Sequence, residues 1–132
     1  MTSQATPPWA FTREHLEFRL REEIERARRY GSHLAVIVLR VNAEDEGAPE
    51  PNETIRLLAS AVRPFDIAAI WEDLEFALCL VQCDRQGAKA ASERVIAALR
   101  PRTVAAGIAV YPEDGEDWRF LTDTARQRME PI

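Results

Sequence analysis

The sequence predicts a single α/β domain in which helices cover a mixed β-sheet that contains one internal hairpin. Four segments carry apolar residues at helical spacing, and four others are short apolar or β-branched runs that indicate strands. Two of these runs, 66–71 and 74–82, are neighbours along the chain and indicate the hairpin. The resulting order, α-β-α-β-β-α-β-α, is typical of an α/β sandwich.

The first helix is expected over residues 12–30, with its apolar residues on one stripe. Thr12 is a suitable N-cap, and Gly31 stands where a C-cap glycine belongs. The next run, LAVIVLRV at 34–41, is nearly continuous and rich in β-branched residues, which predicts a strand buried on both faces. An acidic, proline-containing loop is expected over 43–53.

The second helix is expected over 54–63 and should end at Arg63, because Pro64 pushes the residue before it out of helical backbone angles. The hairpin that follows turns at the acidic pair Glu72-Asp73, without a glycine. Hairpin turns favour Gly or Asn, and Asp tolerates a positive φ better than Glu does. The sequence therefore predicts a reshaped turn rather than a tight two-glycine one.

The C-terminal part of the chain predicts three further elements. A third helix is expected over 87–100, a fourth strand over 103–111 and a last helix over 117–129. The turn PEDGED separates the last two elements. Residues 1–10 are expected to form a polar lead-in, and residues 11–132 the single domain.

The composition indicates a folded protein, since 46% of the residues are hydrophobic and 30% are charged. The formal net charge of −5 argues against binding a long polyanion by counterion release, so nucleic acid is not an expected partner. A small anionic ligand held by a few local arginines is compatible with this charge. All of the 17 basic residues except Lys89 are arginines, the better side chain for planar, bidentate recognition.

The two cysteines, Cys79 and Cys83, are expected to be small buried hydrophobic residues. They stand four apart with no histidine at metal-binding spacing, which argues against a metal site. The N-terminus lacks the features of a signal peptide, and no apolar run approaches the roughly 18 residues of a membrane span. A cytoplasmic protein without a membrane partner is therefore expected.

Four segments of the chain resemble parts of one known family. Residues 22–41 resemble its opening helix and first strand, and IRLLASAVRPFD resembles its second helix with the turn that follows. LEFALCLV resembles the end of its signature motif, and VAAGIAVYPEDGED resembles a late strand and turn, in which YPEDG is the most specific part. The family is that of the GGDEF diguanylate cyclase domains, which make cyclic di-GMP from two GTP molecules. The resemblance covers nearly the whole chain and implies a nucleotidyl-cyclase-type sandwich.

The chain departs from this family where the family carries its catalytic residues. The signature Gly-Gly-Asp-Glu-Phe falls on residues 72–76, of which only Glu75 and Phe76 match. Leu74 replaces a metal-binding carboxylate, and Arg40 stands where relatives carry a metal-binding Asp. A cation is incompatible with a Mg²⁺ site that needs a carboxylate. The departures imply a protein that is not an enzyme, with no catalytic residues, no metal and no cofactor.

One ligand site of the family is matched. Arg63-Pro64-Phe65-Asp66 is an Arg-x-x-Asp segment at the spacing of the family's inhibitory site, which in relatives binds cyclic di-GMP, usually as a stacked dimer. Arg94 resembles a further arginine that relatives supply from the next helix. An arginine fork can pair with O6 and N7 of guanine, and a carboxylate can accept from its N1–H and amino group. The resemblance therefore implies a cyclic di-GMP site at Arg63, Asp66 and Arg94.

The leading hypothesis is a catalytically inactive receptor for cyclic di-GMP that signals by ligand-dependent association or by docking a partner. A stacked ligand dimer would bridge two protomers or recruit another protein. The alternative is a nucleotide-independent interaction or dimerisation module, in which Arg63 and Asp66 only form a salt bridge at a helix end. A third possibility, a weak cyclase, would require turnover of GTP with Mg²⁺. Outside this site, Trp71 is expected to cover the hydrophobic core rather than to stack on a base.

Overall fold

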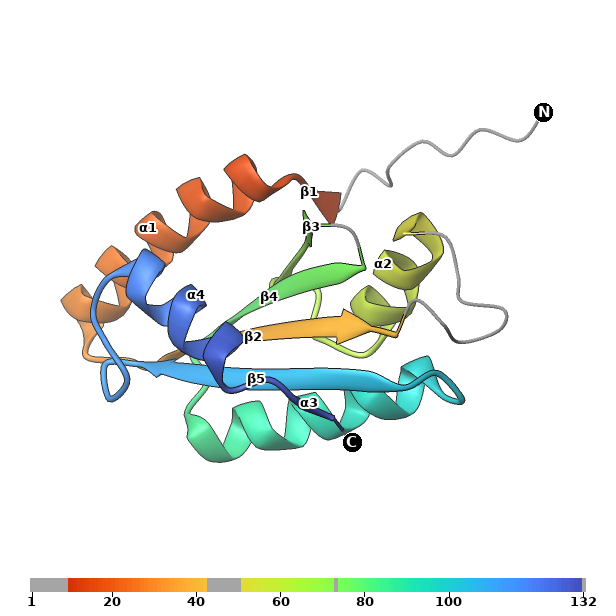
Figure 1. The fold of residues 1–132 in the computed structure, drawn as a ribbon. Helices are drawn as coiled ribbons and strands as arrows, with labels where there is room; N and C mark the ends of the chain where they lie inside the picture. The colour runs from red at the N-terminus through yellow and green to blue at the C-terminus, as the bar shows by residue number, and fades with distance from the viewer. Residues whose placement is uncertain (1–9, 43–50, 73, 132) are drawn as a thin grey trace.

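Helices cover both faces of a central sheet in the computed structural model, which describes residues 10–42, 51–72 and 74–131 (Figure 1). The strands are β1 (Ala10–Phe11), β2 (Leu34–Val41), β3 (Ile67–Glu72), β4 (Glu75–Val81), β5 (Val104–Tyr111) and β6 (Glu130–Pro131). The helices are α1 (Arg13–Tyr30), α2 (Pro51–Ser60), α3 (Arg85–Leu99) and α4 (Trp118–Gln127). The predicted α/β sandwich is confirmed, with two short edge strands, β1 and β6, in addition to the predicted elements.

The order of the strands within the sheet is β1-β3-β4-β2-β5-β6. The four long strands are antiparallel, because β2 pairs with both β4 and β5, and β3 pairs with β4. Among the described strands, parallel pairing occurs between β1 and β3, where Ala10 lies opposite Ala68. The sheet is therefore mixed, as predicted, but only through this short edge strand.

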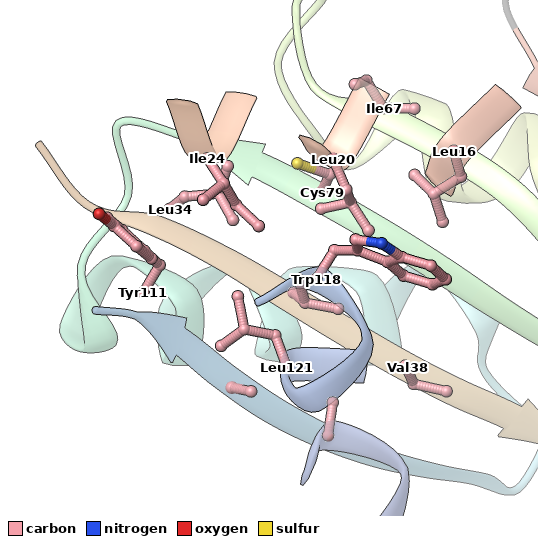
Figure 2. Packing of buried hydrophobic residues seen from close by; sticks show 14 of the residues in the cluster. Leu16, Leu20, Ile24, Leu34, Val38, Ile67, Cys79, Tyr111, Trp118 and Leu121 are labelled. Carbon is pink, nitrogen blue, oxygen red and sulfur yellow. The ribbon is translucent and has the colours of Figure 1, made fainter. Parts of the chain in front are cut away.

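The strand β2 lies inside the sheet and is buried on both faces, as its continuous apolar sequence predicts. Val36 belongs to the apolar layer under α1 and α4, whereas Ile37 and Leu39 belong to the layer under α2 and α3. Figure 2 shows the first layer, in which Leu20 of α1 and Leu121 of α4 pack on the sheet. Burying one such side chain stabilises the fold by roughly 1.5–3 kcal/mol relative to exposure, so these two layers hold the sandwich together.

The bounds of α1 follow from its two caps. Thr12 Oγ1 accepts a hydrogen bond from the N–H of His15 at 3.3 Å. Gly31 adopts a φ of +63°, and its N–H donates to the carbonyl of Ala27. Glycine takes this left-handed conformation without the steric cost of a Cβ. Both predicted ends of this helix are confirmed.

The helix predicted over 54–63 is shifted towards the N-terminus and spans Pro51–Ser60. Proline fits the first turn of a helix, because the N–H that it lacks has no helical partner there in any case. The helix ends before Arg63, whose N–H donates to the carboxylate of Asp66 at 3.1 Å. The prediction for this helix is therefore wrong at both ends, and at the C-terminal end a side-chain acceptor competes with the helical carbonyls.

The other predicted elements lie within two residues of their predicted bounds. The helix α3 begins earlier than predicted because Asp84 caps it, accepting from the N–H of Gly87 at 2.8 Å. Residues 1–9 of the predicted lead-in, 43–50 of the acidic loop and Asp73 of the hairpin turn lie outside the described residues. Within the described part of the chain, no helix has the length and apolar character to cross a membrane.

The turn between β5 and α4 is organised by Asp114. Its carboxylate accepts from the N–H of Val110 at 2.8 Å, from Arg85 Nη2 at 2.9 Å and from Arg128 Nη2 at 3.1 Å. Burial would raise the pKa of Asp114, but these hydrogen bonds, above all that from Arg128, outweigh burial and lower the pKa to about 2. One carboxylate thus joins α3 and the end of α4 to this turn.

Replacing Asp114 with asparagine should destabilise the protein at pH 7 by about 1–3 kcal/mol, because two guanidinium groups lose a charged acceptor. A lowered pKa stabilises the fold above the unfolded-state pKa of roughly 4, and this stabilisation is lost as the pH falls through about 2. Urea unfolding at pH 7 and pH 3 should therefore show a smaller deficit at pH 3. Glu116→Gln, in the same turn, is the control and should change stability little. A deficit of D114N that is equal at both pH values contradicts the assignment.

The strand β5 and the helix α4 approach each other closely at Gly107. A Cβ added there would clash with the carbonyl oxygen of Ala125 and would lie 2.7 Å from the backbone nitrogen of Met129. Backbone atoms cannot move aside as a flexible side chain can, so only glycine fits at this position. The C-terminal end of α4 is therefore fixed over β5.

The substitution Gly107→Ala should lower the free energy of unfolding by about 2 kcal/mol or more, since overpacking a tight contact typically costs 1–3 kcal/mol. Gly31→Ala is the matched control, because Gly31 has a φ of +63° but open space around it. That control should cost only about 1 kcal/mol, the price of a left-handed alanine. Denaturant midpoints measure both variants, and a loss at position 107 no larger than that at position 31 would refute the close contact.

Candidate functional site

The Arg-x-x-Asp segment, residues 63–66, forms a hydrogen-bonded turn between α2 and β3. The N–H of Asp66 donates to the carbonyl of Arg63 at 3.0 Å, and the N–H of Arg63 donates to Asp66 Oδ2 at 3.1 Å. The side chains also pair, with Arg63 Nε 3.1 Å from Oδ2 and Nη2 3.3 Å from Oδ1 of Asp66. The Asp66 side chain is 2% exposed and that of Arg63 is 42% exposed. The turn therefore presents its cation, and not its anion, to solvent.

A second set of contacts ties this turn to the end of β4. The N–H of Val81 donates to Asp66 Oδ1 at 3.1 Å, and Arg63 Nη2 donates to the carbonyl of Val81. The carboxylate of Asp66 thus accepts four hydrogen bonds within the protein. In this conformation Asp66 orients Arg63, and its oxygens can reach a guanine only if these bonds open. Direct contact between Asp66 and a ligand stays a prediction.

The side chain of Arg63 keeps one terminal nitrogen for a ligand. Its Nε and Nη2 are used by Asp66 and Val81, whereas Nη1 has no hydrogen-bond partner among the described residues. The guanidinium carbon lies 4.7 Å from the centre of the Phe65 ring, within cation–π range. The Arg63 guanidinium is therefore held in one orientation and does not offer two parallel N–H donors to a ligand.

Arg94 reaches the same region from α3. Its Nε donates to the carbonyl of Ala61 at 3.3 Å, which anchors the side chain beside the end of α2. Its terminal nitrogens, Nη1 and Nη2, have no hydrogen-bond partner within the described residues. An arginine held in this way keeps the two parallel donors that pair with O6 and N7 of guanine or with a phosphate.

One pocket of about 520 Å³, termed here the arginine pocket, is lined by Arg63, Asp66 and Arg94 together. His33 and Gln82 also line it. This volume lies within the range of roughly 300–1,000 Å³ that is usual for small-molecule sites. The structure thus brings together the three residues that the sequence analysis singled out, and cyclic di-GMP as their ligand stays a prediction.

The cysteines add no nucleophile to this pocket. Cys79 and Cys83 are both free and buried, and Cys83 lines the arginine pocket. Burial raises the pKa of both thiols, in the case of Cys83 against the lowering effect of Arg63. A thiol with a raised pKa stays protonated and reacts poorly. The prediction that these residues are small buried hydrophobic side chains is confirmed.

Two further hollows adjoin the arginine pocket. One of about 610 Å³ shares Arg63 and Asp66 with it. Another, of about 530 Å³, shares Ser32, His33 and Gln82 with it. The residues of formal charge that line the three hollows are Arg19, Arg26, Arg56, Arg63, Arg94, Glu23, Asp66 and Asp84. Five arginines against three carboxylates give the three linings together a formal charge of +2 on a chain of net charge −5, whereas the charged residues of the arginine pocket alone sum to zero.

At the other end of the β3–β4 hairpin, arginines occupy the place where the resemblance puts metal ligands. Glu75 has a side chain that is 2% exposed, and its Oε2 lies 3.1 Å from Arg40 Nη2. Its Oε1 lies 2.7 Å from Arg126 Nε. Such a carboxylate does not fit a Mg²⁺ site, because Arg40 hydrogen-bonds one oxygen, Arg126 forms an ion pair with the other, and the two cations repel the metal. Among the residues that the structure describes, no group of three or more His, Cys, Asp or Glu side chains is placed to hold a metal ion.

The described residues around this hairpin turn are irregular, which agrees with the predicted reshaped turn, and Asp73 itself lies outside them. Leu74 adopts a φ of +60°, which is uncommon for a residue with a Cβ. The register of β3 on β4 shifts between Ile70 and Glu72. The carbonyl of Leu74 accepts from the N–H of Val41 at 2.9 Å, which holds the turn against β2. Long-range contact to β2 therefore places the positive φ at Leu74.

Several residues of these two regions are not identified by the sequence analysis. Gln82 has a φ of +47° beside the arginine pocket, and nothing in its local sequence indicates that conformation. Phe65 lies within the Arg-x-x-Asp segment. A large apolar residue in a polar turn is the sequence feature that could have identified it. Arg126 comes to Glu75 from a distant helix. Trp71, by contrast, is 5% exposed and covers the core as predicted.

Comparison with known proteins identifies the fold. No family model and no curated protein matches the chain. Among solved structures, a DGC protein from Thermotoga maritima superposes with a TM-score of 0.79 and 18% identity, over 92% of this chain and 96% of that one. A sensory box/GGDEF family protein from Caulobacter crescentus has a TM-score of 0.78 and 25% identity over 94% of each chain.

A third solved structure, of a microbial GGDEF domain, concerns an interaction mode of that domain with cyclic di-GMP. It matches with a TM-score of 0.73 and 24% identity, over 92% of this chain and 88% of that one. The three superpositions cover 92%, 94% and 92% of this chain. The chain therefore has the fold of the GGDEF diguanylate cyclase domains.

Proposed function

We propose that this chain is a catalytically inactive GGDEF-like domain that acts as a receptor for cyclic di-GMP. The observation that carries the proposal is the arginine pocket, about 520 Å³ in volume, in which side chains of the α2–β3 turn and of α3 converge. The structural similarity to a GGDEF domain studied with cyclic di-GMP supports the choice of ligand. The formal charge of +2 on the three linings together supports binding of a phosphodiester.

Each side chain of the pocket has a distinct task in this proposal. The free terminal nitrogens of Arg94 form the fork that pairs with the O6 and N7 atoms of one guanine. Nη1 of Arg63 donates to a phosphate oxygen of the ligand, and the buried Asp66 holds the Arg63 guanidinium in place for that contact. The pairing of Arg63 with Asp66 before binding reduces the side-chain entropy that the ligand must otherwise freeze out.

The proposed lack of catalysis rests on the environment of Glu75. Its two oxygens form ion pairs with Arg40 and Arg126, which place two positive charges beside this carboxylate. Diguanylate cyclases need bound Mg²⁺ to activate GTP, and this pair of guanidinium groups puts positive charge where the metal would sit. The turn also carries a leucine at position 74 in place of a carboxylate.

Ligand binding would be signalled by association of the domain with a second protomer or with a partner protein. A stacked pair of cyclic di-GMP molecules on the exposed arginines would bridge two protomers or dock a partner protein. The alternative function is a nucleotide-independent interaction module. The observation in its favour is the salt bridge between Arg63 and Asp66. The Asp66 side chain is 2% exposed, and its carboxylate already accepts hydrogen bonds from within the protein.

Calorimetric titration with cyclic di-GMP tests the receptor proposal. The protein should bind at tens of micromolar or tighter, with two ligand molecules per protein if the ligand stacks. Arg94→Ala should weaken binding by roughly 5- to 150-fold, because a bidentate arginine–guanine pair contributes about 1–3 kcal/mol. Sedimentation with and without ligand then reports whether binding joins two protomers.

Lys89→Ala is the matched control for this titration. Lys89 is exposed on the same helix and lines none of the three hollows, so its removal changes the net charge but not the pocket. Equal weakening by both substitutions would indicate charge attraction alone and would contradict a site at Arg94. No heat with a protein that circular dichroism shows to be folded would reject the receptor and favour the interaction module.

Incubation with GTP and Mg²⁺ should yield no cyclic di-GMP, because the Glu75 carboxylate is occupied by two guanidinium groups. Chromatography of the nucleotides measures the product, with an active diguanylate cyclase as the positive control. Product formation that Glu75→Gln abolishes would show that the site is catalytic after all and would overturn the proposed inactivity.

A further inference from the structure

Two exposed aromatic side chains lie beside the arginine pocket and have no role in the function described so far. Phe65 is 55% exposed and Tyr30 is 71% exposed. Phe65 stands in the turn between α2 and β3, and Tyr30 is the last residue of α1. Both line the hollow of about 530 Å³ that adjoins the arginine pocket. We propose that Phe65 and Tyr30 form an aromatic subsite that stacks on the planar base of a nucleotide.

The ring of Phe65 is held in place although it is exposed. The guanidinium carbon of Arg63 lies 4.7 Å from the ring centre. Arg63 is itself fixed by its double pairing with Asp66 at 3.1 and 3.3 Å. A ring that is positioned before binding loses little conformational entropy when a base stacks on it. The arginine that would contact a phosphate therefore also positions the aromatic residue for a base.

The hollow lined by Phe65 and Tyr30, termed here the aromatic hollow, adjoins the arginine pocket. Ser32, His33 and Gln82 line both. The positive φ of Gln82, +47°, turns the chain sharply at the end of β4, between the two spaces. A ligand with one base at Arg94 would place its second base on this side of the pocket, towards Phe65 and Tyr30.

Arginine side chains lie beside the aromatic rings of this hollow. Arg26 lines the hollow, and Arg26 and Arg19 both pair with the buried Glu23, each with a nitrogen 3.2 Å from Oε2. Arg19 also pairs with Glu22, at 3.5 Å. The positive charge beside the aromatic rings therefore comes from Arg63, whose guanidinium lies over the Phe65 ring. Aromatic faces next to a positive groove are the combination that binds bases and phosphates of single-stranded nucleotides. The subsite therefore suits a purine nucleotide.

The inference rests on the proposed function where it names cyclic di-GMP, the ligand that carries two bases. One guanine would pair with Arg94, and the second would stack in the aromatic subsite. Stacking of a base on an aromatic side chain changes affinity by roughly 5- to 150-fold. The aromatic subsite would thus add affinity for any base. Specificity for guanine would come from the hydrogen bonds of Arg94.

Tyrosine resonances test the subsite directly. The chain contains two tyrosines, of which Tyr30 is 71% exposed and Tyr111 is 4% exposed. Protein labelled with ring-¹³C tyrosine, titrated with millimolar guanosine monophosphate, should show an upfield ring-current shift of Tyr30 and an unchanged Tyr111. Ribose 5-phosphate, which has no base, should shift neither signal. An equal shift with both probes, or no shift with guanosine monophosphate, would overturn the subsite.

Calorimetry with cyclic di-GMP supplies the second measurement. Phe65→Leu and Tyr30→Leu should each weaken binding by about fivefold or more. Phe18→Leu is the matched control, because Phe18 is 60% exposed on α1 but lines none of the three hollows. Phe65→Leu could weaken binding by disturbing the α2–β3 turn. Tyr30→Leu does not have this effect, because Tyr30 is exposed and lies outside that turn.

The two measurements separate the subsite from the receptor function. Unaltered affinity of both variants, with a wild-type protein that binds cyclic di-GMP, would refute the subsite and leave the receptor standing. A wild-type protein that does not bind cyclic di-GMP, but whose Tyr30 shifts with guanosine monophosphate, would refute the receptor and leave a mononucleotide subsite. A Tyr30 signal that shifts with protein concentration alone would mark an interface between copies of the chain and would overturn the subsite.

Discussion

The buried carboxylate of Asp66 is the interaction on which the candidate site depends. A carboxylate that is 2% exposed is costly unless it is paired and fully hydrogen-bonded. Here it is satisfied by the guanidinium and N–H of Arg63 and by the N–H of Val81. One anion therefore ends α2, attaches the α2–β3 turn to the end of β4 and fixes the direction of Arg63. The ring of Phe65 is in turn positioned by that arginine.

Arg63 and Asp66 contribute to the stability of the fold, whereas Arg94 contributes little to it. Asp66 and Arg63 would be retained for stability alone, since removal of either leaves a buried polar group without its partner. Arg94 is different, because it is exposed and gives only one hydrogen bond, to the carbonyl of Ala61. Exposed contacts of this kind contribute little to stability. A functional interpretation of the pocket therefore depends more on Arg94 than on the Arg-x-x-Asp segment that first draws attention.

Most of the fold could be predicted from the sequence, because local signals and tertiary structure agree. Thr12 and Gly31 cap α1 as their residue types indicate, and the apolar run of β2 is buried on both faces. The prediction fails at the end of α2, where the N–H of Arg63 turns to the carboxylate of Asp66. The three pocket residues could be named from a family resemblance. The burial of Asp66 could not, because it depends on Val81, fifteen residues away.

The two ends of the β3–β4 hairpin are far enough apart to change independently. Glu75 begins β4 and Val81 ends it, and six steps at about 3.3 Å per residue separate them by roughly 20 Å. The ladder between them is apolar, as in the pairs Ile67 with Cys79 and Ala69 with Ala77. Charges at one end are screened at the other, since the Debye length is about 8 Å at physiological salt. The arginines at Glu75 therefore act only weakly on the Arg63 pocket, and the two ends of the hairpin can change independently.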